Sequence, residues 1–262
     1  MRRITTFYLI LAFFSYFSNA SASVNDTVND LLNDTKVEHS NTKFIYKLTI
    51  RLHKVCAQFK LDNQIRFSHI EALQLLGGVQ KASGEHSIYS GGSSGDVINC
   101  GHVVPQSFFH NVKVMKSDLH HIYPAHQSIN FAREKYKFAA VPDAEADVIY
   151  NGSVDGVDDS EIVKNISKYG CKISSKNKKF EPDDESKGKV ARACAYFFTR
   201  YSWMLQKMSE VIDISTMVEW HEKYPPNEAE KKREAEIFKV QKNHNPYINQ
   251  SASYMREVWL CK

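Results

Sequence analysis

The sequence lacks three features that would point to common classes of protein. Beyond its first 22 residues it has no apolar run long enough to cross a membrane. The Gly-rich stretch at residues 91–95 has neither the glycine spacing nor the Lys-Ser/Thr pair of nucleotide-binding loops. A strong excess of one charge is also missing, since 34 Lys and Arg residues stand against 30 Asp and Glu. A polyanion partner would therefore have to be recognised by a local patch rather than by overall charge.

Cysteines at the spacing of a structural zinc site are also missing, because no C-x-x-C pair occurs. The five cysteines are an odd number, so at least one has no partner within the chain. In an exported protein we expect disulfides, each contributing roughly 2–4 kcal/mol, but the sequence leaves their pairing open. The alternative is that several are small buried apolar residues. The five are Cys56, Cys100, Cys171, Cys194 and Cys261.

Residues 1–22 have the layout of a secretory signal peptide. Arg2 and Arg3 precede an apolar run at residues 7–17, and Ala20-Ser21-Ala22 is typical of a cleavage site. An N-terminal membrane anchor is the alternative. The prediction is a secreted protein, extracellular, lumenal or periplasmic, that leaves the membrane once the signal is removed and is a monomer. Sequons predict glycosylation at Asn25, Asn33, Asn151, Asn165 and Asn249.

The first third of the chain predicts two helices and a loop. Residues 23–42 are polar and are expected to form a flexible mature N-terminus. Apolar residues at three- and four-residue steps predict an amphipathic helix over 44–59. A shorter helix is expected over 68–76, ending at Gly77-Gly78, and residues 83–96 are expected to form a Gly- and Ser-rich loop.

The central third predicts the order strand, loop, strand, helix. Val97-Ile98 and Val103-Val104 bracket the first strand, which Pro105 closes. The partner strand is expected over 119–123, ended by Pro124. A helix follows over 128–138, with Ser128 as its N-cap.

The last part of the chain predicts irregular structure followed by helices. Residues 141–185 show no clear pattern, whereas 189–204 have a wide apolar face. A T-x-x-E capping box places a helix start near Thr216, and Asn227 with Glu230 starts another that runs to about Gln241.

Three side chains in the central third suit phosphate chemistry. His102 follows an apolar strand, and a neutral imidazole can take a proton from water. Asn130 offers a neutral oxygen of the kind that Mg²⁺ or Ca²⁺ accepts. Arg133 is three residues further along the same predicted helix, so the amide and the guanidinium share one face and could grip one phosphate. Taken singly, each is more often structural.

Asp118, His120 and His121 lie on or beside the second predicted strand. Strand alternation sends the two histidines to opposite faces, so we expect one to be buried in support of the site and the other to face outward. A transition-metal site at the two histidines is the alternative. Asp118 either caps a turn or supports the site from behind.

Several stretches, in consistent order over residues 97–250, resemble the bacterial endonuclease I family of secreted, sugar-nonspecific nucleases. The strongest are Gly101-His102-Val103-Val104-Pro105-Gln106-Ser107, Ser117-Asp118-Leu119-His120-His121 and Asn130-Phe131-Ala132-Arg133. Residues 187–192, 199–201, 219–221 and 240–248 match as well.

The resemblance implies an α+β fold, a mostly helical single domain over residues 43–262 around a ββα-metal nuclease core. It implies a metal-dependent endonuclease that cleaves DNA and RNA without sequence preference and leaves 5′-phosphates. One Mg²⁺, or Mn²⁺ or Ca²⁺ in its place, would be the cofactor. By the resemblance, His102 is the general base, Asn130 a metal ligand and Arg133 a phosphate contact. Asp118 and His121 are candidate supporting residues because of their place on or beside the second predicted strand.

Position 101 departs from the family pattern, which has glutamate there as the other protein ligand to the metal. Glycine has no side chain to offer, and Asp96 or Asp118 would have to compensate. Two functions therefore stand: an endonuclease, weakened or needing more metal, and an impaired relative that binds nucleic acid or a protein. A third interpretation, a secreted helical domain whose motif residues are structural, predicts no effect of metal.

Overall fold

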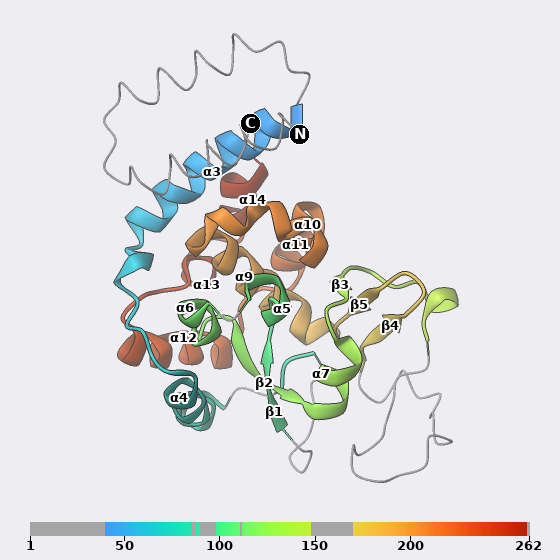
Figure 1. Ribbon diagram of the computed structural model, residues 1–262, viewed down its shortest axis with the longest axis horizontal. Coiled ribbons are helices and arrows are strands. Elements are labelled where there is room, and N and C mark those ends of the chain that lie inside the picture. The colour runs from blue at the N-terminus through green and yellow to red at the C-terminus, as the bar shows by residue number, and fades with distance from the viewer. Residues whose placement is uncertain (1–39, 85–86, 90–97, 111, 148–169, 261–262) are drawn as a thin grey trace. The chain divides into compact units, whose positions relative to one another are not determined.

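The computed structural model describes residues 40–84, 87–89, 98–110, 112–147 and 170–260 (Figure 1). The predicted signal peptide, the predicted flexible segment up to residue 39 and the Gly-rich stretch at 91–95 lie outside these residues. So do four of the five sequons, Asn249 being the exception. The chain divides into two compact units between Ile50 and Arg51. Only residues 40–50, which are helical, are described in the first unit, and all the other described residues belong to the second.

The fold is α+β and mostly helical, with two small sheets. None of the described helices is long and apolar enough to span a bilayer. The helices are α3 (Ser40–Gln58), η1 (Leu61–Asn63), α4 (His69–Ser83), α5 (Gln106–Phe109), α6 (Lys113–Lys116), α7 (Gln127–Arg133), η2 (Asp143–Glu145), α9 (Asp184–Arg200), η3 (Ser202–Lys207), α10 (Met208–Val211), α11 (Ile214–Lys223), α12 (Glu228–Gln241), α13 (Pro246–Asn249) and α14 (Tyr254–Leu260). The strands are β1 (Ile98–His102), β2 (Ile122–His126), β3 (Lys137–Phe138), β4 (Lys172–Ser174) and β5 (Lys179–Glu181).

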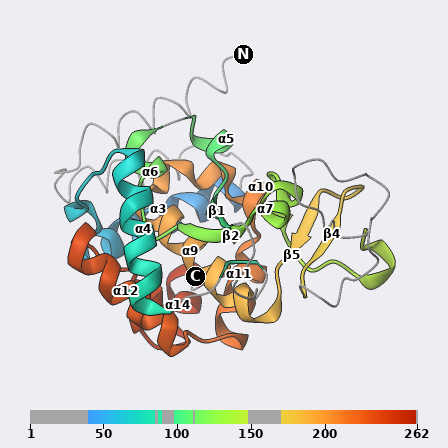
Figure 2. The same cartoon turned by 90° about the horizontal axis from the view of Figure 1, so that it is seen from below.

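Helix α9 is the central element of the core. Nearly all its residues are buried, and α11 and α13 pack against it (Figures 1 and 2). The helix begins five residues before the predicted start, because the Asp183 carboxylate accepts a 2.8 Å hydrogen bond from the Ser186 amide and caps it.

The prediction that a helix over 68–76 ends at Gly77-Gly78 is wrong, because α4 extends beyond both glycines. The structure adds a capping box of Ser68 and Glu71 at the predicted start, and the helix continues through both glycines to Ser83. Leu76 and Val79 lie in one apolar cluster with Ile237 of α12, and α4 and α12 lie side by side in both views (Figures 1 and 2). Burial on both sides of the glycines outweighs their helix penalty of about 1 kcal/mol each.

Other predicted elements need correction as well. Residues 137–138, predicted as helix, and part of 141–185, predicted as irregular, form a three-stranded sheet in the order β3-β5-β4. The Thr216 capping box is wrong, because α11 begins at Ile214 with Asp213 at its N-cap. The Asn227 cap is confirmed by a 2.8 Å bond from the Glu230 amide to its side chain. Residues 40–42, predicted as flexible, belong to α3.

No disulfide joins the four described cysteines, so the expected crosslinks are not found among them, while Cys261 lies outside the described residues. Cys171 and Cys194 are fully buried, as the alternative interpretation expected. Burial raises the pKa of each of the four thiols to about 12, which keeps them protonated and unreactive.

Gly188 marks the closest approach between α9 and the end of α11. A Cβ at this position would lie 2.0 Å from the Tyr224 carbonyl oxygen and 2.8 Å from Arg192 Nη2. We therefore expect Gly188→Ala to lower the free energy of unfolding by at least about 1–3 kcal/mol in urea titrations. A Cβ at Gly78 meets nothing within 4 Å, so the control Gly78→Ala should raise stability by up to about 1 kcal/mol. Equal stability of the two variants would contradict this interpretation.

Candidate active site

Strands β1 and β2 form an antiparallel pair that positions the motif residues. The register pairs Cys100 with Pro124 and Gly101 with Tyr123. Strand β2 runs through Pro124, although the sequence predicted that this proline ends it. The Val103 amide donates to the His121 carbonyl, which makes Cys100 and Pro124 a pair without hydrogen bonds. The ladder therefore needs no N–H from Pro124, and the strand can continue.

Helix α7 follows β2 directly and lies beside β1 (Figure 1). Asn130 Oδ1 is 3.1 Å from the point that a Cβ on Gly101 would occupy. The side chain missing at position 101 would thus start next to this amide oxygen. Asn130 borders an open cavity of about 330 Å³, which is lined by Cys100, His102, Pro105, Gln106, Ser107, Asn130, Arg133, Glu134 and Lys135.

His102 is 7% exposed and both its ring nitrogens have partners. Nε2 lies 2.9 Å from the Lys116 carbonyl oxygen, an acceptor only, so Nε2 carries the proton. Nδ1 is then the basic nitrogen, and it accepts a 3.1 Å hydrogen bond from the Gln106 amide. Burial, with His121 as the next cause, lowers the pKa of His102 to about 3. The imidazole is therefore neutral at physiological pH and can accept a proton, and the same burial makes it a weaker base than an exposed imidazole.

The sequence does not identify Gln106 and Lys116 as the hydrogen-bond partners of His102. The four-residue spacing of His102 and Gln106 suits a helix, but the chain between them is a strand end and a turn. The carbonyl of Lys116 left no signal in the sequence, because any residue could supply it.

Arg133 lines the cavity, but its guanidinium already donates hydrogen bonds to backbone carbonyl oxygens. It is almost fully buried and donates to the carbonyl oxygens of His102, at 3.1 Å, and Val103, at 2.6 Å. The guanidinium carbon lies 4.3 Å from the centre of the Phe138 ring. In this arrangement Arg133 holds the end of β1 in place through these two hydrogen bonds. Its predicted contact with a phosphate remains a prediction.

The two adjacent histidines are both buried, so the expectation that one faces outward is wrong. Strand β2 begins only at Ile122, and strand alternation does not apply to a turn. His121 Nε2 is 2.6 Å from the Met115 carbonyl oxygen, and its ring packs edge-on against His102 with centroids 5.5 Å apart. His120 Nε2 is 3.0 Å from the Asn243 carbonyl oxygen. His121 thus lies directly behind the proposed base.

The endonuclease I family model matches residues 29–252, most of the chain. The chain belongs to the endonuclease I family. Two relatives are both described as Endonuclease-1. The protein from Buchnera aphidicola subsp. Baizongia pistaciae is 29% identical over 53% of this chain and 49% of its own length. The one from Buchnera aphidicola subsp. Acyrthosiphon pisum is 27% identical over 52% and 46%. The matched segments therefore span about half the length of these relatives.

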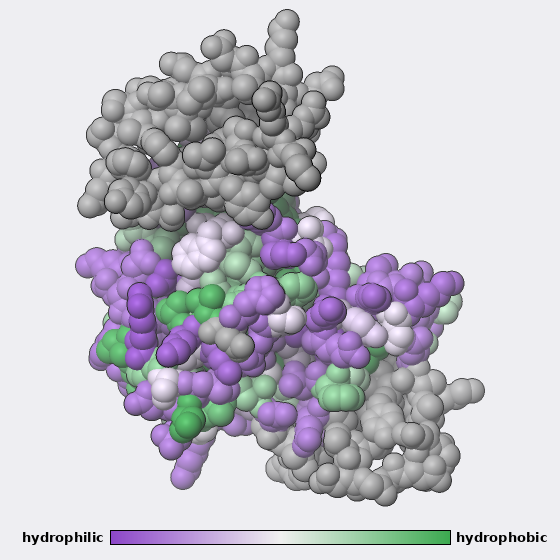
Figure 3. Space-filling view, viewed as in Figure 1, coloured by the Kyte–Doolittle hydropathy of each residue, from purple (hydrophilic) through white to green (hydrophobic). Residues whose placement is uncertain are grey.

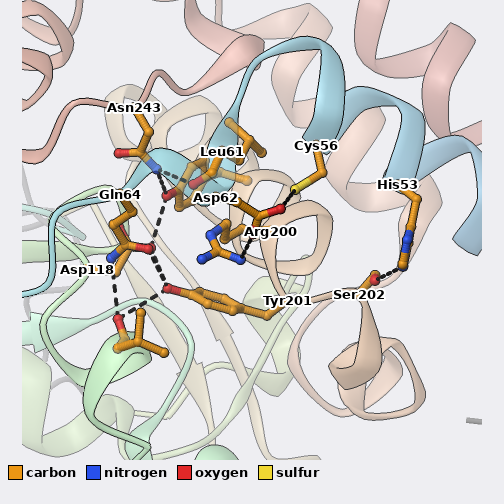
Figure 4. Close-up of polar contacts among 12 residues, drawn as sticks. His53, Cys56, Leu61, Asp62, Gln64, Asp118, Arg200, Tyr201, Ser202 and Asn243 are labelled. Carbon is orange, nitrogen blue, oxygen red and sulfur yellow. Dashed lines mark hydrogen bonds and ion pairs between the residues drawn. The ribbon is translucent and has the colours of Figure 1, made fainter. Parts of the chain in front are cut away.

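Asp118 of this endonuclease I family member is a buried hub rather than a substitute ligand. Its carboxylate accepts hydrogen bonds from the Tyr196 and Tyr201 hydroxyls, the Gln241 amide and the His120 backbone N–H. Figure 4 shows the carboxylate and Tyr201 together with Gln64 and Asn243. Asp118 therefore caps a turn and supports the chain that holds the two histidines. It does not line the cavity, and Asp96 lies outside the described residues.

The side chains present suit only a loosely held divalent ion. Among the described residues, no group of three His, Cys, Asp or Glu side chains could hold a metal. Asn130 Oδ1 could supply one oxygen ligand, and it lies next to the place where the side chain of a residue at position 101 would begin. Mg²⁺ keeps several waters and takes further oxygens from phosphates, so one amide oxygen fits such an ion without gripping it strongly.

Proposed function

We propose that this protein is a metal-dependent endonuclease that hydrolyses phosphodiester bonds in DNA and RNA and leaves 5′-phosphates. The observation that carries the proposal is that His102 and Asn130 line one open cavity in a chain of this family. The proposal includes secretion of the mature chain and action as a monomer on nucleic acid without sequence preference.

The chain's own residues account for the proton transfer. His102 is the only histidine that lines the cavity among the described residues, and the Lys116 carbonyl fixes its tautomer so that Nδ1 is the basic nitrogen. A water bound at Nδ1 loses its proton to the imidazole as its oxygen bonds to phosphorus. The bond between phosphorus and the 3′ oxygen breaks, and the 3′ oxygen leaves as a hydroxyl group after taking a proton from solvent. The Gln106 amide must first turn away from Nδ1, which its half-exposed position allows. Asn130 would hold the ion, and the ion, when bound, stabilises the negative charge on the phosphate.

Gly101 favours a second function, in which an impaired site binds nucleic acid or a protein without cleaving it. Mutating the residues that support metal ligands typically lowers metal affinity or activity by roughly 10–100-fold. The loss of a charged ligand should lower them by at least as much. The limited space beside position 101 also favours glycine there. A Cβ at 101 would lie 2.9 Å from Ala125 Cβ, so a side chain there requires a small shift of the strand pair.

Nicking of supercoiled plasmid by the purified mature chain, over a series of Mg²⁺ and Mn²⁺ concentrations, tests the two functions. We expect slow nicking that rises with metal and disappears in EDTA. Gly101→Glu should raise the rate at low metal by roughly 10–100-fold or more. Combining it with Ala125→Gly removes the close contact and should raise the rate further, whereas Ala125→Gly alone should not.

The results separate the two functions. Nicking by the native chain that Asn130→Ala lowers supports a nuclease that works without a ligand from position 101. An inactive native chain with an active Gly101→Glu variant means that the scaffold is intact and the binding function holds. Inactivity of every variant, with folding verified by circular dichroism, would reject the nuclease.

A further inference from the structure

Phe131 is the most exposed large hydrophobic side chain among the described residues, at 74%. It lies in α7, where some of its neighbours are buried and others line the cavity. Ile129 and Arg133 on either side are buried, and Asn130 lines the cavity. Residues two apart on a helix do not share a face, so Phe131 is directed away from the core that Ile129 joins.

The position of Phe131 places it at the rim of the candidate active site. Asn130 precedes it, and Arg133, Glu134 and Lys135 shortly after it also line the cavity. Figure 3 shows a small apolar spot where α7 lies, bordered by hydrophilic residues. At the end of α7, Glu134 has φ 48° and ψ −119°, a combination that non-glycine residues rarely adopt.

A single exposed apolar residue is common on protein surfaces and proves nothing by itself. A protein partner would need a broad apolar patch, with several such residues together. Here one aromatic ring stands among polar groups, beside an exposed lysine, Lys135. This combination matches a nucleotide, whose flat base stacks on an aromatic ring while its phosphate meets cationic and amide groups.

We propose that Phe131 stacks on a nucleobase adjacent to the phosphate at the cavity, and that it thereby positions the strand for cleavage. The inference rests on the proposed function in taking nucleic acid as the ligand, but it does not require catalysis. Stacking on an aromatic ring tolerates every base, so the contact strengthens binding without selecting a sequence. Single-stranded segments, whose bases are free to stack, should gain most.

Binding without cleavage tests the proposal. The mature chain is titrated in EDTA against single-stranded and duplex oligonucleotides that carry 2-aminopurine, whose fluorescence reports stacking. We expect Phe131→Leu and Phe131→Ala to weaken binding to single strands by roughly 5- to 150-fold and to abolish the fluorescence change. Phe131→Trp keeps a ring and should keep both. The control Ile70→Ala removes a side chain that is 70% exposed on α4, outside the cavity lining, and should leave binding unchanged.

Plasmid nicking by the same variants separates this proposal from the proposed function. Weaker binding by Phe131→Leu supports the stacking contact even if no variant nicks DNA, in which case the nuclease alone fails. Nicking by the native chain with unchanged binding in Phe131→Leu would overturn the stacking contact and leave the nuclease standing. Absence of any binding by the native chain would also overturn it.

Discussion

His102→Asn is expected to lower the rate of plasmid nicking by roughly 10²–10⁴-fold, the contribution of a positioned general base. The imidazole is neutral, its Nε2 donates to the Lys116 carbonyl oxygen, and the residue lines the cavity. An asparagine in its place has no basic nitrogen. The rate is measured at saturating plasmid and metal, in the native chain and in the Gly101→Glu background. Imidazole added to His102→Ala should restore part of the activity, because it supplies the missing base.

His110→Asn is the matched control for this prediction. His110 is exposed, lies outside the cavity lining and has φ 45°, a conformation that asparagine tolerates. It should nick plasmid like the parent. Thermal unfolding followed by circular dichroism checks that His102→Asn remains folded. A folded His102→Asn variant that retains its activity within threefold would remove His102 from the mechanism.

Glu230→Ala is expected to lower the free energy of unfolding by roughly 3–5 kcal/mol, because it leaves the buried guanidinium of Arg192 without its counter-ion. Both side chains of this pair are 1% exposed. Two hydrogen bonds join them, Arg192 Nε to Oε1 at 2.7 Å and Nη2 to Oε2 at 2.6 Å. The pair links α9 to α12, and Arg192 Nη1 also donates to the Tyr224 carbonyl oxygen. Urea unfolding at neutral pH measures the loss.

Glu222 and Arg256 provide a control with the same geometry and different burial. Two hydrogen bonds of 2.7 Å join them as well, but their side chains are 30% and 54% exposed. Glu222→Ala should cost no more than about 1 kcal/mol, because water already screens the pair. Replacing Arg192 and Glu230 together by methionine should cost less than Glu230→Ala alone. Equal losses for Glu230→Ala and Glu222→Ala would show that burial does not determine the strength of these pairs.

Local sequence signals predicted well where the deciding contact spans a few residues. Asn227 with Glu230 caps α12 as the spacing of the two residues indicates, and α4 begins at His69, next to the predicted start at Ser68. The signals failed where distant residues decide. The apolar cluster shared with α12 carries α4 through Gly77 and Gly78, and the register of β1 and β2 admits Pro124 into β2. A propensity of about 1 kcal/mol per residue is small beside the burial of several side chains.

The sequence by itself determined the family, the order strand, strand, helix at the site, and the residue types at positions 101, 102 and 130. These follow from side-chain chemistry and from spacing along the chain. Only the tertiary structure decided which nitrogen of His102 is basic, that Arg133 holds the end of β1 in place, and that Asp118 is held by residues of α9 and α12. The partners of Asp118 include hydroxyl and amide groups 78 and 123 residues away. Contacts at such separations depend on packing and burial, which a local pattern does not encode.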